Sequence, residues 1–214
     1  GGAPVSAAES VIAALDGDGI AALDDISSLV DHSLMRVEHL DADGDPRVRM
    51  LETIREYAAE LLDASDEQDA VRSAHAAAFL DLAARTEPEF INPRPGPIVA
   101  RLRAEDDNFR AALDWLGGQT GSDLGCTELR LATGLVNYWR RIGRYQEAES
   151  RLDQAMQHCP QPEPAIRAAA LVGLGFVAAR RGDSTAAIER FQETVAIRRT
   201  IGDRESKKKT LQYL

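Results

Sequence analysis

The second half of the chain repeats a pattern of apolar and small residues, and this repeat constrains the fold more than any other feature. Two glycines, Gly143 and Gly182, lie 39 residues apart in similar surroundings. The two series are Leu135, Trp139, Gly143, Ala148, Leu152, Ala155 and Pro160, and Leu174, Gly175, Ala178, Gly182, Ala187, Phe191 and Val195. Each series predicts a helix, a tight turn at the glycine and a second helix. Helix pairs of this kind stack into a solenoid.

These units resemble tetratricopeptide (TPR) repeats, whose helix pairs stack into a superhelix. The spacing exceeds the usual period of about 34 residues, which indicates long-helix variants. We expect TPR-like repeats over residues 126–214, with a third unit beginning near Leu211. A weaker helical region at 66–118 is expected to be a linker or a degenerate helix pair. Two repeats without a cap leave an apolar face open, so we expect a continuing chain or a covering partner.

Residues 33–51 alternate with period two, unlike the rest of the chain. Ser33–Leu40 and Arg47–Leu51, joined by a turn-like stretch at 41–46, predict a β-hairpin. Predicted helices flank it, with apolar stripes formed by Leu23, Ile26, Leu29 and Val30 in residues 20–30 and by Ile54, Tyr57, Ala58 and Leu61 in residues 52–62. This order predicts a partial winged-helix unit over residues 1–65. The expected fold class is mainly α, a partial winged-helix unit with one β-hairpin followed by an α-solenoid of TPR-like helix pairs.

Two longer helices and a proline-rich linker are predicted between these regions. Ser65 can cap a helix that runs to about Arg85, with a core face of Val71, Ala74, Ala78 and Leu82. Four prolines between residues 88 and 97 exclude a continuous helix, so 86–96 is expected to be a linker or domain edge. One helix over 98–116 and a loop over 119–125 follow.

The charge of the chain is uneven and argues against direct DNA contact. The formal net charge is −10, and residues 1–70 hold seventeen acidic residues and four arginines. The predicted helix at 20–30 has no Lys or Arg and carries Asp24 and Asp25, with Asp31 directly after it. Phosphate contacts dominate affinity for DNA, and an anionic membrane surface would repel the same region. No apolar run is long enough to span a bilayer, so we expect a cytoplasmic protein.

No catalytic or metal-binding motif is found in the sequence. It has no GxxxxGK[ST], GxSxG or HExxH pattern, and the turn at 41–45 lacks the final Glu of a calcium loop. Cys126 and Cys159 are expected to be free, buried thiols. Residues 105–107 are expected to form a solvated helix face. The four histidines, which do not pair at helical spacing, are His32, His39, His75 and His158. We therefore expect no enzyme, no metal and no cofactor in this chain.

Five stretches of the sequence, taken in their order along residues 1–200, carry a resemblance to a known family. They are Leu23–Leu34, Arg49–Ala58, His75–Ala83, Glu105–Trp115 and the helix containing Tyr138 and Trp139. As an ordered set they resemble actinobacterial signal-transduction ATPases of the STAND class, found in LuxR-type and cyclase-linked transcriptional regulators. The resemblance implies a P-loop ATPase core, then a winged-helix lid, then a helical repeat sensor. ATP or ADP is expected only in the ATPase core, which this chain lacks. The start at Gly1 without methionine supports a fragment that begins inside the winged-helix domain.

The resemblance also implies a nucleotide-sensor motif, Met-His-Asp, whose histidine contacts the β-phosphate of bound ADP. The matching residues here are Met50, Leu51 and Glu52. Leucine cannot donate a hydrogen bond to phosphate, so this contact cannot be carried over. We expect Met50 and Leu51 to pack as a strand end in the hairpin core.

Arginine and aromatic side chains in the repeats mark a candidate partner-binding groove. Trp139 is expected to pack in the repeat core. Basic residues also cluster at Arg180–Arg181 and Arg198–Arg199, either as one cationic strip for an acidic peptide or ligand, or as ordinary solvated arginines. The expected groove residues are Tyr138, Arg141, Arg144, Arg180 and Arg181.

The function that these observations favour is that of a non-catalytic regulatory or sensor fragment of a STAND-type transcriptional regulator. Its repeats would bind a protein or small-molecule signal, and its partner would be a protein, a peptide or its own ATPase core. An oligomer is possible. The alternative is a stand-alone TPR-type adaptor for protein–protein interaction.

Overall fold

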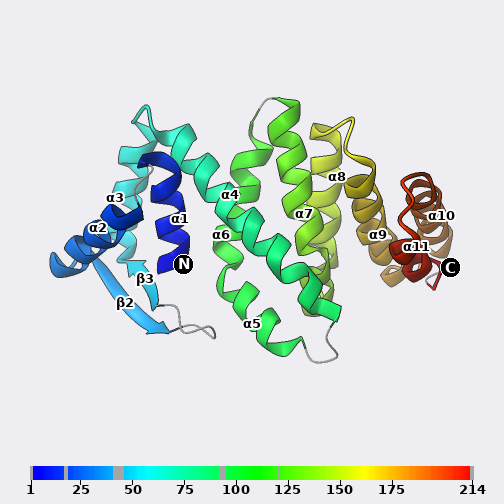
Figure 1. The fold of residues 1–214 in the computed structure, drawn as a ribbon, viewed down its shortest axis with the longest axis horizontal. Coiled ribbons are helices and arrows are strands. Elements are labelled where there is room, and N and C mark those ends of the chain that lie inside the picture. Colours follow the sequence, from blue (N-terminus) through cyan, green and yellow to red (C-terminus); the bar gives the residue numbers. More distant parts are fainter. Residues whose placement is uncertain (1, 17–18, 41–45, 92–94, 120, 213–214) are drawn as a thin grey trace. The chain divides into compact units, whose positions relative to one another are not determined.

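Two compact units make up the chain in the computed structural model, which describes residues 2–16, 19–40, 46–91, 95–119 and 121–212 (Figure 1). The first unit comprises Gly1–Leu82 and Pro93–Ala112, and the second comprises Ala83–Asn92 and Leu113–Leu214. Two helices, α4 (Gln68–Thr86) and α6 (Asp106–Gly117), have residues in both units. The units therefore alternate along the sequence.

The first unit begins with short helices and a three-stranded antiparallel sheet. Its elements are β1 (Ala3–Pro4), α1 (Val5–Asp16), α2 (Gly19–Asp31), β2 (Met35–Leu40), β3 (Pro46–Met50) and α3 (Glu52–Asp63). The strand order is β1-β3-β2, and both outer strands pair antiparallel with β3. The predicted hairpin and its flanking helices are confirmed, and β1 and α1 add to them. Of the predicted turn at 41–46, residues 41–45 lie outside the described residues and Pro46 begins β3.

The apolar stripes of this region are only partly buried. Ile26 is buried, whereas Leu23 on the same helix is exposed. No residue of α3 is buried, and its Tyr57 and Leu61 side chains are 60% and 54% exposed. Leu23, Tyr57 and Leu61 of the predicted apolar stripes are therefore exposed to solvent in this structure.

The predicted core face of helix α4 is confirmed only in part, since Leu82 is buried but the other three predicted residues are not. Its buried residues are Ala76, Phe79, Leu82, Ala83 and Thr86, whereas Val71, Ala74 and Ala78 are half-buried. Phe79 meets Phe109 of α6 edge to face, with ring centroids 5.6 Å apart. Aromatic pairs favour this geometry, and the bulky Phe79 ring sets which face of α4 turns inward.

The helix expected over 98–116 is broken in two, as α5 (Gly96–Ala104) and α6. The break falls at Glu105, which is only 1% exposed, so the expectation of a solvated face is wrong for this residue. Its carboxylate accepts hydrogen bonds from Arg47 of β3 and from Asn108 Nδ2, the latter at 2.7 Å. An ion pair with a residue distant in sequence thus brings a charged side chain into the interior.

In the second unit the end of α4 is followed by a 3₁₀ helix, η1 (Glu87–Ile91), where the sequence predicted the start of a linker. Phe90 of this helix is buried. The unit continues with α7 (Ser122–Ile142), α8 (Tyr145–His158), α9 (Pro164–Arg180), α10 (Ser184–Thr200) and α11 (Arg204–Leu211). Helix α7 includes residues 122–125, which were expected to be a loop.

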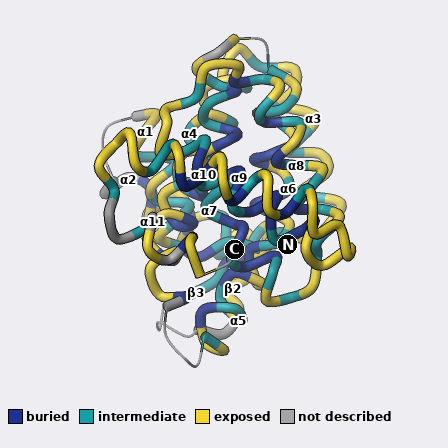
Figure 2. Tube along the Cα trace, turned by 90° about the vertical axis from the view of Figure 1, so that its right-hand side faces the viewer, coloured by how far each residue is buried: buried dark blue, intermediate teal, exposed yellow. Residues whose placement is uncertain are grey.

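Consecutive helices of the second unit pack against each other, and α7 to α10 form the two predicted helix pairs (Figure 1). Gly143 and Gly182 adopt φ values of 78° and 83°, and Gly202 before α11 adopts 74°. This left-handed conformation favours glycine because it lacks a Cβ atom. Ala148, Leu152, Ala187 and Phe191 are all buried, as predicted, and buried stretches run along these helices (Figure 2).

A disulfide joins the first helix pair. Cys126 in α7 and Cys159 after α8 are bonded, with their Cα atoms 4.8 Å apart. The expectation of two free thiols is therefore wrong. Gly125 explains how the two segments come so close, because a Cβ atom there would lie 2.3 Å from the carbonyl oxygen of His158.

Candidate functional site

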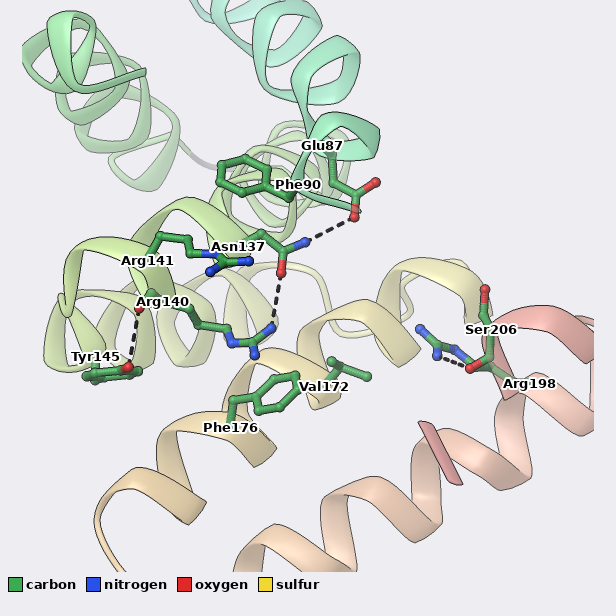
Figure 3. A pocket seen from close by; sticks show the side chains of 10 residues that line it. All are labelled: Glu87, Phe90, Asn137, Arg140, Arg141, Tyr145, Val172, Phe176, Arg198 and Ser206. Carbon is green, nitrogen blue, oxygen red and sulfur yellow. Dashed lines mark hydrogen bonds between the residues drawn. The ribbon is translucent and has the colours of Figure 1, made fainter. Parts of the chain in front are cut away.

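A cavity of about 690 Å³ lies within the second unit (Figure 3). We refer to it as the repeat cavity. Its lining comes from η1, all four repeat helices and α11, and consists of Glu87, Phe90, Asn137, Arg140, Arg141, Tyr145, Val172, Phe176, Arg198 and Ser206. Its size is in the range of about 300–1,000 Å³ that is typical of ligand pockets.

The end of α7 brings two guanidinium groups to this cavity. Arg140 and Arg141 occupy the last turn of the helix, directly before Ile142 and the left-handed Gly143. Cations are favoured there because the final carbonyl groups of a helix carry partial negative charge. The local sequence thus stabilises a concentration of positive charge at this end of the repeat.

Arg140 is held in place from several sides. Its guanidinium carbon lies 3.3 Å from the centroid of the Phe176 ring, and its Nη1 atom donates to Asn137 Oδ1 at 3.1 Å. Asn137 Nδ2 in turn donates to Glu87 Oε1 at 3.2 Å, and the Tyr145 hydroxyl donates to the carbonyl oxygen of Arg140 at 3.2 Å. Figure 3 shows this chain of contacts across three helices and η1. Because each group is tied to the next, the floor of the cavity is preorganised.

The far side of the cavity has a third guanidinium group. Arg198 of α10 donates to the carbonyl oxygen of Ser206 at 2.6 Å and also to the hydroxyl of Thr210. The lining therefore carries three arginines and one carboxylate, that of Glu87. The lining of the repeat cavity is thus positively charged, although the whole chain has a net charge of −10.

The structure places the expected groove residues differently from the prediction. Of these residues Arg141 lines the repeat cavity, whereas Tyr138 is 1% exposed and belongs to the core with Trp139. Arg144, which directly precedes α8, pairs with Glu147 in the first turn of that helix. Arg181 forms an ion pair with Glu149 at 2.6 Å, and Arg180 lies over the Tyr145 ring at 5.2 Å.

Sequence reasoning missed most of the cavity lining, including Asn137 and Phe176. One signal could have found them. Asn137 and Arg141 are four residues apart, as are Val172 and Phe176, so each pair lies on one face of its helix. Tyr138 directly follows Asn137 in the sequence, so it lies on another face of α7, and its side chain is buried in the core.

Two family descriptions match separate parts of the chain. Residues 4–63 match "Winged helix-turn-helix domain", and residues 128–200 match "Tetratricopeptide repeat". The chain therefore contains a winged helix domain and TPR repeats. These matches agree with the β1-β3-β2 sheet of the first unit and with the helix pairs of the second.

Curated relatives come from Mycobacterium bovis and from two strains of Mycobacterium tuberculosis, and each is named "Putative HTH-type transcriptional regulator". Each is 32% identical over 212 residues, which cover 95% of this chain and 23% of the relative. The chain thus spans about a quarter of the length of these relatives. No solved structure matches the chain at a significant level.

The winged helix domain holds the residues of the expected nucleotide-sensor motif. Met50, Leu51 and Glu52 line a shallow cavity of about 260 Å³ together with Arg36, Glu38 and Arg49. Leu51 is 44% exposed, so the expectation that it packs in the hairpin core is wrong. It precedes α3, where the chain leaves the sheet. A hydrogen bond from Arg55 lowers the pKa of Glu52.

The TPR repeats bury one carboxyl group beside the disulfide. Glu128 is fully buried, and its Oε2 atom lies 2.7 Å from His158 Nδ1. Its Oε1 atom has no hydrogen-bond partner among the described residues. Burial raises the pKa of Glu128.

In the first unit, burial lowers the pKa of His75. The His75 ring packs against the Phe79 ring, with the two ring centroids 4.7 Å apart.

The described residues offer little support for other kinds of site. Among them, no group of three His, Cys, Asp or Glu side chains could hold a metal ion. None of the helices over the described ranges is both long and apolar enough to cross a membrane. The His32 ring bonds to the carbonyl of Ser28, and nothing is described for the His39 side chain.

Proposed function

We propose that this chain is a non-catalytic regulatory part of a STAND-type ATPase transcriptional regulator that acts in the cytoplasm. The winged helix domain serves as the nucleotide-dependent lid of an ATPase core, and the TPR repeats receive a protein signal. The observation that carries the proposal is the surface of the winged helix domain. This surface is acidic where a DNA-reading domain is basic, and it exposes large apolar side chains.

The acidic surface lies on α2, which corresponds to the recognition helix of a helix-turn-helix. A recognition helix enters the major groove between two rows of phosphates. Helix α2 has no Lys or Arg, and Asp24, Asp25 and Asp31 are all exposed. Each carboxylate would be repelled by nearby phosphates, so this helix is poorly suited to the groove.

The same domain exposes large apolar side chains on elements that are close in the sequence. They are Leu23 of α2, Val37 of β2, Leu51, and Tyr57 and Leu61 of α3. Large exposed apolar surface marks sites of protein contact. A lid that packs against an ATPase core needs such a surface, which supports the proposed role.

The repeats would act on the core through two states of the whole regulator. In a closed state the lid covers bound ADP, and in an open state nucleotide exchanges. A partner that binds the TPR repeats more tightly in one state shifts the population toward it. In this scheme the residues of this chain bind and position, and the reaction takes place elsewhere.

Calorimetry with nucleotides tests this proposal. We expect ADP to bind the full-length regulator, whereas this chain alone, which has no phosphate-binding loop and carries Leu51 in place of the sensor histidine, shows no micromolar affinity. In the full-length protein, Tyr57→Asp should speed the release of a fluorescent ADP analogue, because the lid contact is weakened. Micromolar ADP binding by this chain alone, or unchanged release in the variant, would contradict the proposal.

DNA binding by the wing is a second candidate function, which the family description of residues 4–63 favours. The hairpin carries Arg36, which is exposed, and Arg49, which faces Glu38 at 3.6 Å. A mobility-shift assay of this chain with its own promoter region distinguishes the two functions. Salt-sensitive binding that Arg36→Glu abolishes would favour DNA contact. A gene without an upstream GxxxxGK[ST] motif would instead favour a stand-alone TPR adaptor.

A further inference from the structure

The structure assigns a ligand class to the repeat cavity: an acidic peptide segment with an aromatic or branched aliphatic side chain next to its carboxylates. This inference rests on the proposed function of the repeats as a receiver of protein signals, and it specifies the partner. The juxtaposition that carries it is Arg141 beside the stacked pair of Arg140 and Phe176.

Charge complementarity defines the polar part of the ligand. Arg141 is exposed and lines the cavity, and none of the described acidic side chains forms an ion pair with it. Arg140 and Arg198 are held by neighbouring groups, and their positive charge stays at fixed positions. A carboxylate that enters the cavity meets one adaptable guanidinium and two fixed ones, an arrangement suited to bidentate hydrogen bonds.

The apolar part of the lining defines the second part of the ligand. Phe90, Val172 and Phe176 line the cavity beside the arginines, and Phe176 is braced edge to face by Phe191 with ring centroids 5.4 Å apart. A free anion such as phosphate would leave these surfaces uncovered. An aromatic or branched aliphatic side chain would bury them, and such side chains dominate binding energy at protein interfaces.

The position of Glu87 argues against a nucleic acid. Its carboxylate lines the same cavity and accepts a hydrogen bond from Asn137, which fixes its negative charge close to Arg140. A phosphate backbone spreads charge evenly and would be repelled at this point. A peptide can place its carboxylates near Arg141 and an uncharged group near Glu87.

Selection from a library tests the ligand class without assuming a sequence. Random dodecapeptides displayed on phage are selected against the intact 214-residue chain, and enriched peptides are resynthesised with fluorescein for anisotropy measurements. We expect the enriched sequences to combine Asp or Glu with an aromatic or aliphatic residue. Their affinity should fall several-fold as salt is raised, because screening weakens exposed ion pairs.

Charge-reversed variants then locate the binding site. Arg141→Glu should weaken binding roughly tenfold or more, and Arg141→Gln should weaken it less, because the Glu variant adds repulsion to the lost contact. Arg199→Glu is the matched control, since Arg199 is an exposed arginine of the same unit that does not line the cavity. Circular dichroism of each variant establishes that it is folded.

Three results would overturn the inference. They are enrichment of peptides without acidic residues, binding that Arg141→Glu leaves unchanged, and capture of a fluorescent single-stranded oligonucleotide or of phosphate in preference to the peptides. These outcomes leave the proposed lid function standing, because that function is tested by ADP release from the full-length regulator. Loss of nucleotide dependence there would in turn leave the peptide measurements valid.

Discussion

The Cys126–Cys159 disulfide is expected to contribute much of the stability of the first helix pair. The two cysteines are 33 residues apart, and closing a loop of this length lowers the entropy of the unfolded chain. In the chain-entropy description this stabilises the fold by about 4 kcal/mol. Reduction should change the folded state little, because the close approach of Gly125 to His158 and the burial of Cys159 hold the segments together without the bond.

The expected effect is large enough to measure by thermal unfolding. For a chain of about this size, 1 kcal/mol shifts the unfolding midpoint by roughly 2–4 °C, so reduction should lower the midpoint of the repeat unit by about 8–15 °C. Far-ultraviolet circular dichroism follows the helices with and without dithiothreitol, after thiol titration has established the redox state of each sample. The double variant Cys126→Ser/Cys159→Ser serves as the control and should not respond to the reductant.

Two results would refute this reasoning. Thiol titration of protein purified without reductant could show both cysteines free, which would contradict the pairing itself. Alternatively, the oxidised and fully reduced protein could unfold at the same temperature. That outcome would mean that the bond strains the folded state by as much as it restricts the unfolded chain.

Three further predictions concern buried groups. Glu105→Ala should destabilise the first unit by about 3 kcal/mol in urea unfolding, because it leaves the guanidinium of Arg47 without its buried partner. Gly125→Ala should cost about 2–3 kcal/mol in the same assay, since its Cβ atom would collide with the backbone of His158. Burial raises the pKa of Glu128, so the folded state binds its proton more tightly than the unfolded chain. Stability should therefore fall as pH rises from about 4.5 through the raised pKa, and Glu128→Gln should remove this fall in a pH series of unfolding measurements.

The repeats could be predicted from the sequence because their signals are local. Gly143 and Gly182 mark turns with a positive φ, and Ala148 and Ala187, which follow each glycine by five residues, are both buried. The β-hairpin was predictable for the same reason, since alternation with period two is read within a few residues. Both features were found with nearly the observed boundaries.

The residues that the sequence placed wrongly depend on contacts between distant segments. Glu105 breaks a helix and is buried because Arg47 lies opposite, 58 residues earlier in the chain. Cys126 and Cys159 pair because the start of α7 and the end of α8 lie close together. Tyr138 turns inward and Arg141 outward, and composition alone cannot tell which face of α7 meets its neighbours. Spacing predicts that a helix has two faces, and packing decides which of them becomes a binding surface.

The salt bridge between Arg47 and Glu105 has a mechanical consequence for the first unit. Arg47 belongs to the central strand β3, and Glu105 lies at the break between α5 and α6, so one contact links the sheet to the junction of two helices. Pulling the hairpin away would leave the Glu105 carboxylate buried without its partner, so the junction is expected to follow the hairpin. Within the first unit, the position of the wing hairpin is therefore coupled to the junction of α5 and α6.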